Sequence, residues 1–212
     1  MPGELILASA SPRRRELLST LGLAFRCVPA EIDESMAAGE APEALVCRLS
    51  LSKAEAIARE FPGATVIGAD TIVVLDGEVL GKPRTPEEAA RMLRRLRDRA
   101  HEVLTAIAVC RGDQTIQRLN RTQVWMRAYS EEEIAAYVAS GDPLDKAGAY
   151  AIQHPGFRPV ARWDGCYASI VGLPLADVAA ALEEVGWKIS TRVADACRNV
   201  TGVRCCQEDQ AP

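Results

Sequence analysis

The chain has 212 residues, of which 48% are hydrophobic and 25% are charged. This length and composition suffice for one globular domain with a substantial core. The net charge is −4 and the basic residues are scattered along the chain. These features argue against the broad electropositive surface that direct nucleic-acid binding requires, so no nucleic-acid partner is expected.

The first residues do not resemble a targeting or membrane segment. Met1–Leu7 lacks a basic region, and the apolar run stops at Ser9. This argues against a secretory signal peptide and a membrane span there. We therefore expect a cytoplasmic protein with no membrane partner.

The cysteines favour buried thiols over disulfides or metal sites. There are seven, an odd number. Four lie within apolar segments, which is typical of buried thiols: Cys27, Cys47, Cys110 and Cys166. The adjacent pair Cys205-Cys206 has no C-x-x-C spacing and no nearby histidine, so a structural metal site is not expected.

Five helices are predicted from capping residues and from apolar positions that share one helical face. Ser11 before Pro12, and the capping-box pairs Thr85/Glu88 and Ser130/Glu133, mark three of the starts. The helices are expected over 12 to about 21, about 45–57, 86–96, 131 to about 141, and 175–185.

Runs rich in β-branched residues predict the strands. Thr65–Leu75 is one such run, expected to break at Gly68-Ala69-Asp70, and Asp76-Gly77 after it predicts a hairpin. Further strands are expected over 5–8, 25–28, 101–110, 115–126 and on each side of the turn Asp164-Gly165. Because hairpins alternate with helices, we expect an α/β fold with a mixed sheet and helices on its faces.

A single domain with two lobes is expected over residues 1–187. Residues 188–212 mix single charges and three cysteines with no sustained apolar period. We therefore expect a peripheral C-terminal tail of unknown role.

Three consecutive arginines lie in the first turn of the first predicted helix. Arg13, Arg14 and Arg15 follow Pro12, where the helix dipole already makes cations unfavourable. A bound anion would reverse this, because backbone N–H groups and guanidinium groups would converge on its oxygens. A solvated basic turn paired with glutamates explains the arginines about equally well.

Asp70 is a candidate catalytic carboxylate, because it follows a strand-like run at a glycine where the backbone can bend. An aspartate that caps a turn is the simpler interpretation. Asp33 and Glu34 form a second acidic pair, for which solvated loop charge is the simpler account. The loop 145–153 combines charge, small residues and an amide, and a plain connection explains it equally well.

Two lysines would complete a site for a triphosphate with magnesium. Carboxylates would hold the metal, and Lys53 and Lys82 would face the oxygens that gain charge during bond cleavage. Lys82 lies between Gly81 and Pro83 at the exit of a hairpin, where the restricted backbone can aim a side chain. Each lysine alone is also typical of a protein surface.

Together these segments resemble the Maf family of septum-formation inhibitor-like proteins, also described as nucleoside triphosphate pyrophosphatases. The matching motifs span roughly residues 5 to 185 in the family's order: Leu7-Ala8-Ser9-Ala10-Ser11-Pro12-Arg13-Arg14, Glu34, Lys53, Gly68-Ala69-Asp70-Thr71, Lys82-Pro83, Asp145-Lys146-Ala147-Gly148-Ala149-Tyr150 with Gln153, and Val171-Gly172-Leu173-Pro174-Leu175. The resemblance implies a two-lobed α/β fold with an elongated central sheet, similar to inosine-triphosphate pyrophosphatases. The nucleotide would lie in the cleft between the lobes.

The resemblance also implies roles for single residues. The implied catalytic residues are Asp70 (the proton acceptor), Glu34 and Lys82, and Asp70 and Glu34 would hold a divalent cofactor, Mg²⁺ or Mn²⁺. The implied substrate-binding residues are Ser9, Arg13, Arg14, Lys53, Thr71 and Gln153. Three of these would set base specificity, since they match the dTTP/UTP subgroup and not the 7-methyl-GTP subgroup: Arg13, Thr71 and Gln153.

The activity implied is metal-dependent hydrolysis of dTTP and UTP, or of modified pyrimidine nucleotides, to the monophosphate and pyrophosphate. A homodimer is also consistent with the resemblance. Two departures are visible: Gly81 stands where many relatives carry an acidic residue, so a metal or water contact made there would be absent, and Ala151 replaces a common glycine. Two alternatives stay open, a regulator of cell division acting through nucleotide or partner binding, and a 7-methyl-GTP-type activity.

Overall fold

A computed structural model describes residues 3–206, and its centre is a seven-stranded sheet in the order β2-β1-β3-β5-β6-β7, with β4 paired to β3. The strands are β1 (Leu5–Leu7), β2 (Arg26–Cys27), β3 (Thr65–Leu75), β4 (Glu78–Leu80), β5 (Ala100–Arg111), β6 (Gln114–Met126) and β7 (Val160–Asp164). Strand β1 is parallel to β2 and β3, whereas the other pairs are antiparallel. The predicted α/β fold with a mixed sheet is confirmed.

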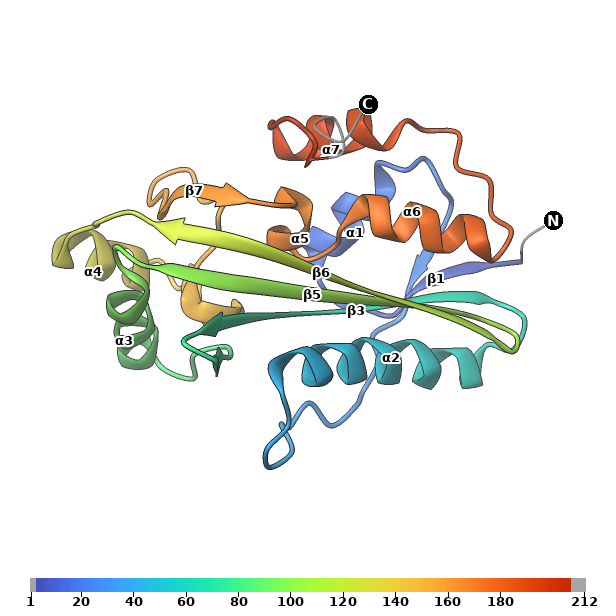
Figure 1. The fold of residues 1–212 in the computed structure, drawn as a ribbon, viewed down its shortest axis with the longest axis horizontal. Helices are drawn as coiled ribbons and strands as arrows, with labels where there is room; N and C mark the ends of the chain where they lie inside the picture. The colour runs from blue at the N-terminus through green and yellow to red at the C-terminus, as the bar shows by residue number, and fades with distance from the viewer. Residues whose placement is uncertain (1–2, 207–212) are drawn as a thin grey trace.

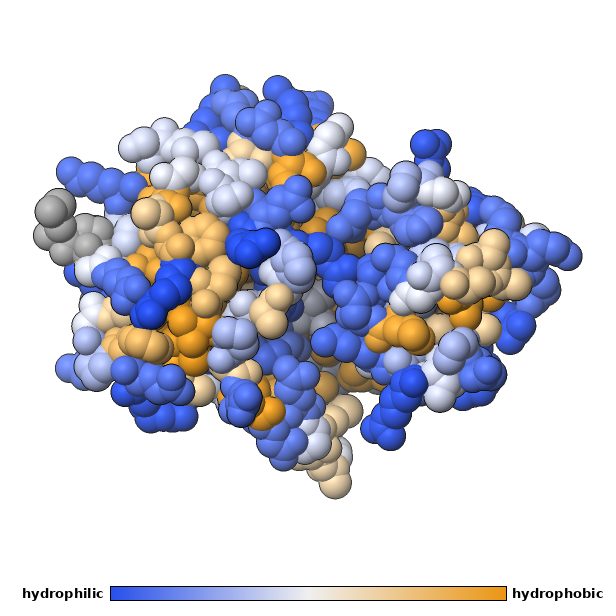
Figure 2. Space-filling model, turned by 180° about the vertical axis from the view of Figure 1, so that it is seen from behind, coloured by the Kyte–Doolittle hydropathy of each residue, from blue (hydrophilic) through white to orange (hydrophobic). Residues whose placement is uncertain are grey.

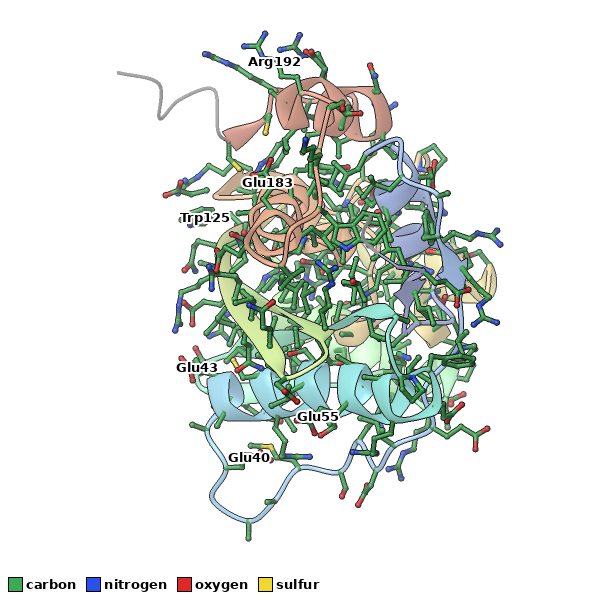
Figure 3. The ribbon with its side chains drawn as sticks, turned by 90° about the vertical axis from the view of Figure 1, so that its right-hand side faces the viewer. Glu40, Glu43, Glu55, Trp125, Glu183 and Arg192 are labelled. Carbon is green, nitrogen blue, oxygen red and sulfur yellow. The ribbon has the colours of Figure 1, made fainter. Side chains whose placement is uncertain are left out.

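Helices cover both faces of this sheet. They are α1 (Pro12–Ser19), α2 (Pro42–Glu60), α3 (Pro86–Leu96), α4 (Glu131–Ala139), α5 (Tyr167–Val171), α6 (Leu175–Glu184) and α7 (Val193–Thr201), with two short 3-10 helices, η1 (Asp142–Asp145) and η2 (Ala147–Ala149). In Figure 1, α2 lies along one face, α1, α5 and α6 lie over the other, and α3 and α4 lie at one end of the long strands. Figure 3, viewed along the strands, shows the layers in order from α2 through the sheet to α6 and α7.

The hydrophobic core of the described residues includes two clusters that join α2 to the sheet and two others that lie toward opposite ends of the long strands. One cluster, which includes Leu18, Ile67 and Leu182, joins β3 to α1 and α6. Another, which includes Leu93 and Tyr129, packs α3 against the far end of the sheet. Strands β3, β5 and β6 run through both ends, as Figure 1 shows. The two lobes stay a prediction.

Capping hydrogen bonds confirm the predicted helix starts. The Oγ of Ser11 accepts a hydrogen bond from the Arg14 amide at 3.4 Å. Ser130 and Glu133 form both halves of a capping box at the start of α4. These starts depend on residues within one turn of each other, which is why the sequence reveals them.

Strand β3 is continuous, so the predicted break at residues 68–70 is wrong. Strand β5 pairs with it from Thr65 to Val74, and this long register holds the glycine inside the strand. Gly68 serves another purpose, because a Cβ there would lie 2.2 Å from the Ser50 carbonyl oxygen and 2.7 Å from the Ala54 amide nitrogen. Helix α2 therefore packs directly on the β3 backbone at this point.

The edge of β3 opposite β5 is paired only at its two ends. Strand β1 pairs with Thr65–Ile67, and β4 pairs with Val73–Leu75. Since β5 occupies one edge over this whole length, β1 and β4 must share the other. Within the described part of the chain, no strand fills the gap at residues 68–72 between them. Asp70 lies in the middle of this gap.

The segment after Asp164-Gly165 is the helix α5, so the second strand predicted there is wrong. The Cys166 amide donates to Thr122 Oγ1 at 3.0 Å, and Thr105 Oγ1 donates to the Ser169 carbonyl at 2.9 Å. These contacts with β5 and β6 stabilise a short helix whose β-branched residues, by propensity alone, favour a strand.

Residues 188–206 include the helix α7, which was not predicted. It contacts α1, α5 and α6 and is the outermost layer over α6 in Figure 1. The rest of the predicted tail, residues 207–212, lies outside the described residues, and the domain boundary at residue 187 stays a prediction. Within residues 3–206, no helix combines the length and apolar character needed to cross a bilayer.

Gly68→Ala should destabilise the protein by about 1–3 kcal/mol, because the added methyl group would collide with the backbone of α2. Chemical denaturation measures this free energy. Gly81→Ala is the matched control, since a Cβ there would have no neighbour within 4 Å, and its effect should stay within about 0.5 kcal/mol. Equal stability of the two variants would contradict the close approach of α2 to β3.

Candidate active site

A cavity of about 370 Å³ lies beside the gap in the edge of β3. The start of α1, the helices α2 and α5 and the loop 145–153 all contribute to its wall. Most of the predicted site residues line it together: Ser9, Arg13, Arg14, Glu34, Lys53, Thr71, Lys82 and Gln153. Asp70 does not line it directly but is hydrogen-bonded to Lys53, which does. Figure 2 shows the molecule hollowed near the middle of one face, with mainly hydrophilic side chains around the hollow.

The start of α1 forms one wall of the cavity. Ser9 Oγ accepts a hydrogen bond from the Ser11 amide at 3.2 Å, and Ser11 caps the helix. Pro12 and Arg13 of the first turn line the cavity. A helix N-terminus attracts anions through its dipole and its free N–H groups, so this wall suits a phosphate.

Two carboxylates share one lysine at the gap. The Lys53 Nζ lies 2.6 Å from Asp70 Oδ1 and 2.6 Å from Glu34 Oε1. Because both carboxylate oxygens contact the same nitrogen, Asp70 and Glu34 lie close together. Lys53 and Asp70 are each only 8% exposed, so each charge depends on its partner for compensation.

Glu34 is held in its charged form. Burial raises the pKa of Glu34, but the hydrogen bond from Lys53 and the charges of Lys53, Lys82 and Arg14 together lower it below its usual value. Glu34 therefore stays ionised at neutral pH and can accept hydrogen bonds or bind a cation. Lys82 lines the same cavity as Glu34.

The carboxylates of Asp70 and Glu34 fit a divalent cation. Mg²⁺ is commonly held by one or two carboxylates together with waters and substrate phosphates. Within residues 3–206, no three or more acidic, histidine or cysteine side chains are arranged to hold a metal ion by themselves. Phosphate oxygens and water would therefore have to complete the coordination of an ion bound at this pair.

Arg14 joins three segments around the gap. Its Nε donates to the Gly172 carbonyl at 2.9 Å, its Nη1 to the Ala69 carbonyl at 2.8 Å, and its Nη2 to Thr71 Oγ1 at 3.1 Å. Burial lowers the pKa of Arg14, while the charge of Asp70 acts in the opposite direction. Because its guanidinium group already donates to three protein oxygens, Arg14 mainly holds the wall of the cavity in place.

Arg13 differs from its neighbour in this respect. It lines the same cavity, but within residues 3–206 its side chain makes no hydrogen bond or ion pair. Successive residues of a helix point about 100° apart, so Arg14 can turn to β3 while Arg13 turns elsewhere. Arg13 is thus the arginine available to a phosphate.

The hydrogen bonds around Thr71 determine whether its hydroxyl acts as a donor or as an acceptor toward the cavity. Thr105 Oγ1 lies 2.9 Å from the Ser169 carbonyl oxygen and 3.0 Å from Thr71 Oγ1. A carbonyl only accepts, so the single Thr105 proton goes to Ser169 and the Thr71 proton goes to Thr105. Because Thr71 also accepts from Arg14, only an acceptor lone pair is left to face the cavity.

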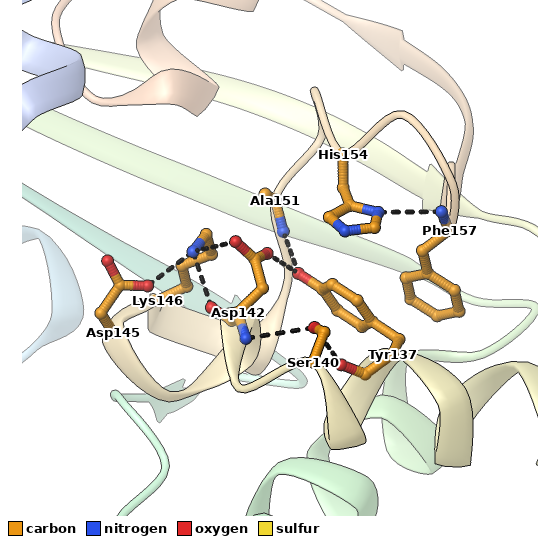
Figure 4. A network of polar contacts seen from close by, with 8 residues as sticks. All are labelled: Tyr137, Ser140, Asp142, Asp145, Lys146, Ala151, His154 and Phe157. Atoms are coloured by element: carbon orange, nitrogen blue, oxygen red, sulfur yellow. Dashed lines mark hydrogen bonds and ion pairs between the residues drawn. The ribbon is translucent and has the colours of Figure 1, made fainter.

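A buried network fixes the loop that carries Gln153. Lys146 Nζ donates to the Asp142 carbonyl at 2.6 Å and to Asp142 Oδ1 at 2.9 Å. The Tyr137 hydroxyl donates to Asp142 Oδ2 at 2.6 Å and accepts from the Ala151 amide at 3.0 Å. Figure 4 shows these contacts. The charge of this loop is therefore used to hold its shape, and Gln153 follows two residues after the fixed amide.

A second loop is attached to this one. The Gly148 amide donates to the Gly81 carbonyl at 3.1 Å. Gly148 has a φ of 69°, and a Cβ there would lie 3.0 Å from a methyl group of Val73. A side chain at position 148 would therefore push the loop away from β3, and Lys82 with it.

The sequence did not reveal the apolar part of the site. Tyr150 lines the cavity, and its hydroxyl lies 2.8 Å from His101 Nε2. Burial lowers the pKa of His101 to about 4, so its imidazole is neutral at physiological pH. Three aliphatic residues complete this wall: Val73, Val103 and Ile170. Their strand or helix patterns resemble those of ordinary core residues, and only the folded arrangement distinguishes them.

Comparison with known proteins places the chain in a family. Residues 4–185 match the family described as Maf-like protein. A dTTP/UTP pyrophosphatase of Thermomicrobium roseum is 48% identical over 188 residues, which are 88% of this chain and 86% of the relative. The proteins of the same name from Myxococcus xanthus and Moorella thermoacetica are 50% and 49% identical, covering 89% and 90% of this chain and 95% and 99% of theirs.

The similarity to a solved structure is weaker than the similarity to these sequence relatives. The crystal structure of protein VC0702 from Vibrio cholerae aligns with a TM-score of 0.33 and 10% identity, over 64% of this chain and 69% of that one. At that score the two folds are not shown to be the same. The family match and the long, highly identical relatives agree with the motifs that surround the cavity, and they show that this chain belongs to the Maf family.

Proposed function

We propose that this protein hydrolyses dTTP and UTP to the monophosphate and pyrophosphate, with a divalent metal ion as cofactor. The observation that carries the proposal is the Asp70–Lys53–Glu34 cluster at the gap in β3, next to the helix N-terminus that carries Arg13. Relatives that match most of their length are named dTTP/UTP pyrophosphatases, which supports the substrate class. A cytoplasmic location and a homodimer remain predictions.

The cavity is lined by residues lying on both faces of β3, and the residues on the two faces differ in charge. Asp70 and Thr71 are consecutive, and side chains alternate between the two faces of a strand. Asp70 bonds to Lys53 of α2, whereas Thr71 bonds to Arg14 of α1 on the other face. The charged half suits a triphosphate, and the half with Thr71 and the apolar wall suits a base.

In this proposal Asp70 is the proton acceptor for the attacking water. Its carboxylate is held in place by Lys53, and a positioned carboxylate can remove a proton as water attacks the α-phosphorus. Arg13, Lys53 and Lys82 would neutralise the charge that grows on the departing pyrophosphate. Held by Asp70 and Glu34, a divalent cation would supply Lewis-acid polarisation of the phosphate oxygens.

Base choice would depend on hydrogen-bond polarity. Thr71 offers an acceptor to the cavity, and Gln153 offers both a donor and an acceptor. The N3–H of uracil or thymine complements an acceptor, whereas the unprotonated N3 of cytosine would face it as a second acceptor. A buried pair of acceptors is costly, so such a site rejects the wrong base strongly.

Asp70→Asn should lower kcat by at least about a hundredfold, because the amide cannot accept the proton from water. Pyrophosphate release from UTP measures the rate, and a thermal melt checks that the fold survives. Asp76→Asn, a change at an exposed hairpin turn, serves as the control and should leave kcat unchanged. A rate near that of the unmodified protein would remove Asp70 from this role.

The two arginines of the first turn should respond differently to substitution. Arg13→Lys should raise the KM for nucleotide roughly tenfold, because a guanidinium binds phosphate with two donors and an ammonium does not. Its melting temperature should stay the same. Arg14→Lys should lower the melting temperature by several degrees, because a lysine cannot bond three oxygens in different directions. The reverse pattern would assign the phosphate contact to Arg14.

A nucleotide panel tests the substrate class. UTP and dTTP should be hydrolysed at least about a hundredfold faster than CTP, as the acceptor polarity of Thr71 requires. Products are identified as monophosphate and pyrophosphate, with Mg²⁺ and again with a chelator, which should abolish turnover. Faster hydrolysis of 7-methyl-GTP than of UTP would contradict the pyrimidine assignment, and full activity with the chelator would contradict the metal.

A further inference from the structure

Four of the seven cysteines meet away from the cavity, although they are distant in sequence. Cys166, Cys197 and Cys205 are 6%, 5% and 4% exposed and belong to one hydrophobic cluster, and Cys206 packs against that cluster. Cys166 precedes α5, whereas the others lie in α7 and in the segment that follows it. The family match ends at residue 185, so three of the four lie beyond it.

The four thiols form a connected group of side-chain contacts. Cys206 contacts both Cys166 and Cys205, and Cys205 also contacts Cys197. All four are free thiols in this structure. Within residues 3–206, no three of them are arranged as ligands of one metal ion. The arrangement therefore favours chemistry between two sulfur atoms over chelation.

Cys206 and Cys166 have complementary properties. Cys206 is the half-buried member of the group, so a small solute can reach it. The hydrogen bond from Cys166 lowers the pKa of Cys206, with a further contribution from Cys205. The same contact with Cys206, together with burial, raises the pKa of Cys166. Cys206 is also the more accessible of the two thiols, and a thiolate is the nucleophilic form of cysteine, so Cys206 is the reactive partner.

We propose that Cys206 and Cys166 form an oxidation site at which a hydroperoxide converts the pair into a disulfide that fastens the C-terminal segment to the start of α5. The Cys206 sulfur attacks a peroxide oxygen and the O–O bond breaks. The departing oxygen takes a proton to leave as water or an alcohol, and Cys206 becomes a sulfenic acid. The Cys166 sulfur then attacks Cys206, the S–O bond breaks, and water leaves as the S–S bond forms. Two thiols lose two electrons in total, and one peroxide gains them.

The disulfide would close a loop that contains α5, α6 and α7. A cross-link of this kind stabilises a protein mainly by restricting its unfolded chain. It would also fix the start of α5, whose residues Ile170 and Val171 line the cavity. The site thus connects the segment beyond the family match to one wall of the proposed nucleotide site.

The test is oxidation of the whole protein by a small excess of hydrogen peroxide, followed by alkylation of free thiols and peptide mass mapping. The expected product is a Cys166–Cys206 cross-linked peptide, with Cys27, Cys47 and Cys110 fully alkylated. The melting temperature should rise by several degrees and return to its original value after reduction with a dithiol. Rapid oxidation of Cys47 with no Cys166–Cys206 product would overturn the proposal.

Three variants separate the roles of the two thiols. Cys166→Ser should leave Cys206 as a sulfenic acid that dimedone traps, whereas Cys206→Ser should give no adduct at Cys166. Cys47→Ser is the matched control, since Cys47 is a half-buried thiol on α2 and belongs to another cluster, and it should still form the disulfide. A dimedone adduct at Cys166 in Cys206→Ser would reverse the order of attack and refute the mechanism. These outcomes do not depend on whether the protein hydrolyses nucleotides.

Discussion

The site depends on the ammonium group of Lys53, which is buried between Asp70 and Glu34. An unpaired charge at the depth of Lys53 and Asp70 would be costly, so these two groups depend on each other. Glu34 is the more exposed partner of the same ammonium group. Their meeting requires α2 to lie unusually close to the sheet. Gly68 permits that approach, because its missing side chain leaves room for the helix backbone next to Lys53. A packing constraint in the core thus fixes the position of the charged groups.

The gap in the edge of β3 gives these groups access to a ligand. Strands β1 and β4 end on either side of it, so a cavity lies beside β3 where a complete sheet would have another strand. Arg14 uses the Ala69 carbonyl that a neighbouring strand would otherwise bond. The missing strand thereby provides both an opening and an anchor for the first helix and for the loop at Gly172.

The alternation of side chains along β3 explains why the cavity has a charged side and a less polar side. Neighbouring residues of β3 point to opposite faces, and each face is covered by a different helix. On the side of α2, the charged groups of Lys53 and Asp70 lie together. On the side of α1 and α5, the Thr71 hydroxyl lies near aliphatic side chains. The loop 142–153 completes the second side, and its shape is set by hydrogen bonds internal to the loop and to α4, which need no ligand.

The sequence by itself determined the features that depend on near neighbours. Ser11 and Ser130 revealed helix starts, Asp76-Gly77 revealed the hairpin, and alternating hairpins and helices revealed the mixed sheet, since caps, turns and periodicity act over a few residues. The motifs also identified most of the polar residues that line the cavity. Only the tertiary structure decided how they differ. It gave Arg14 to the protein's own oxygens, whereas the Arg13 side chain has no such bond within residues 3–206 and lines the cavity.

The same physical reason accounts for the elements that were predicted wrongly or not at all. The break expected at Gly68 is absent because β5 pairs across it, and the strand expected after Gly165 is α5 because β5 and β6 bind its residues. Helix α7 depends on contacts with α1, α5 and α6, and the meeting of Cys166 with Cys206 joins two segments about forty positions apart. A local sequence pattern does not predict such contacts, because they form only when distant segments pack together.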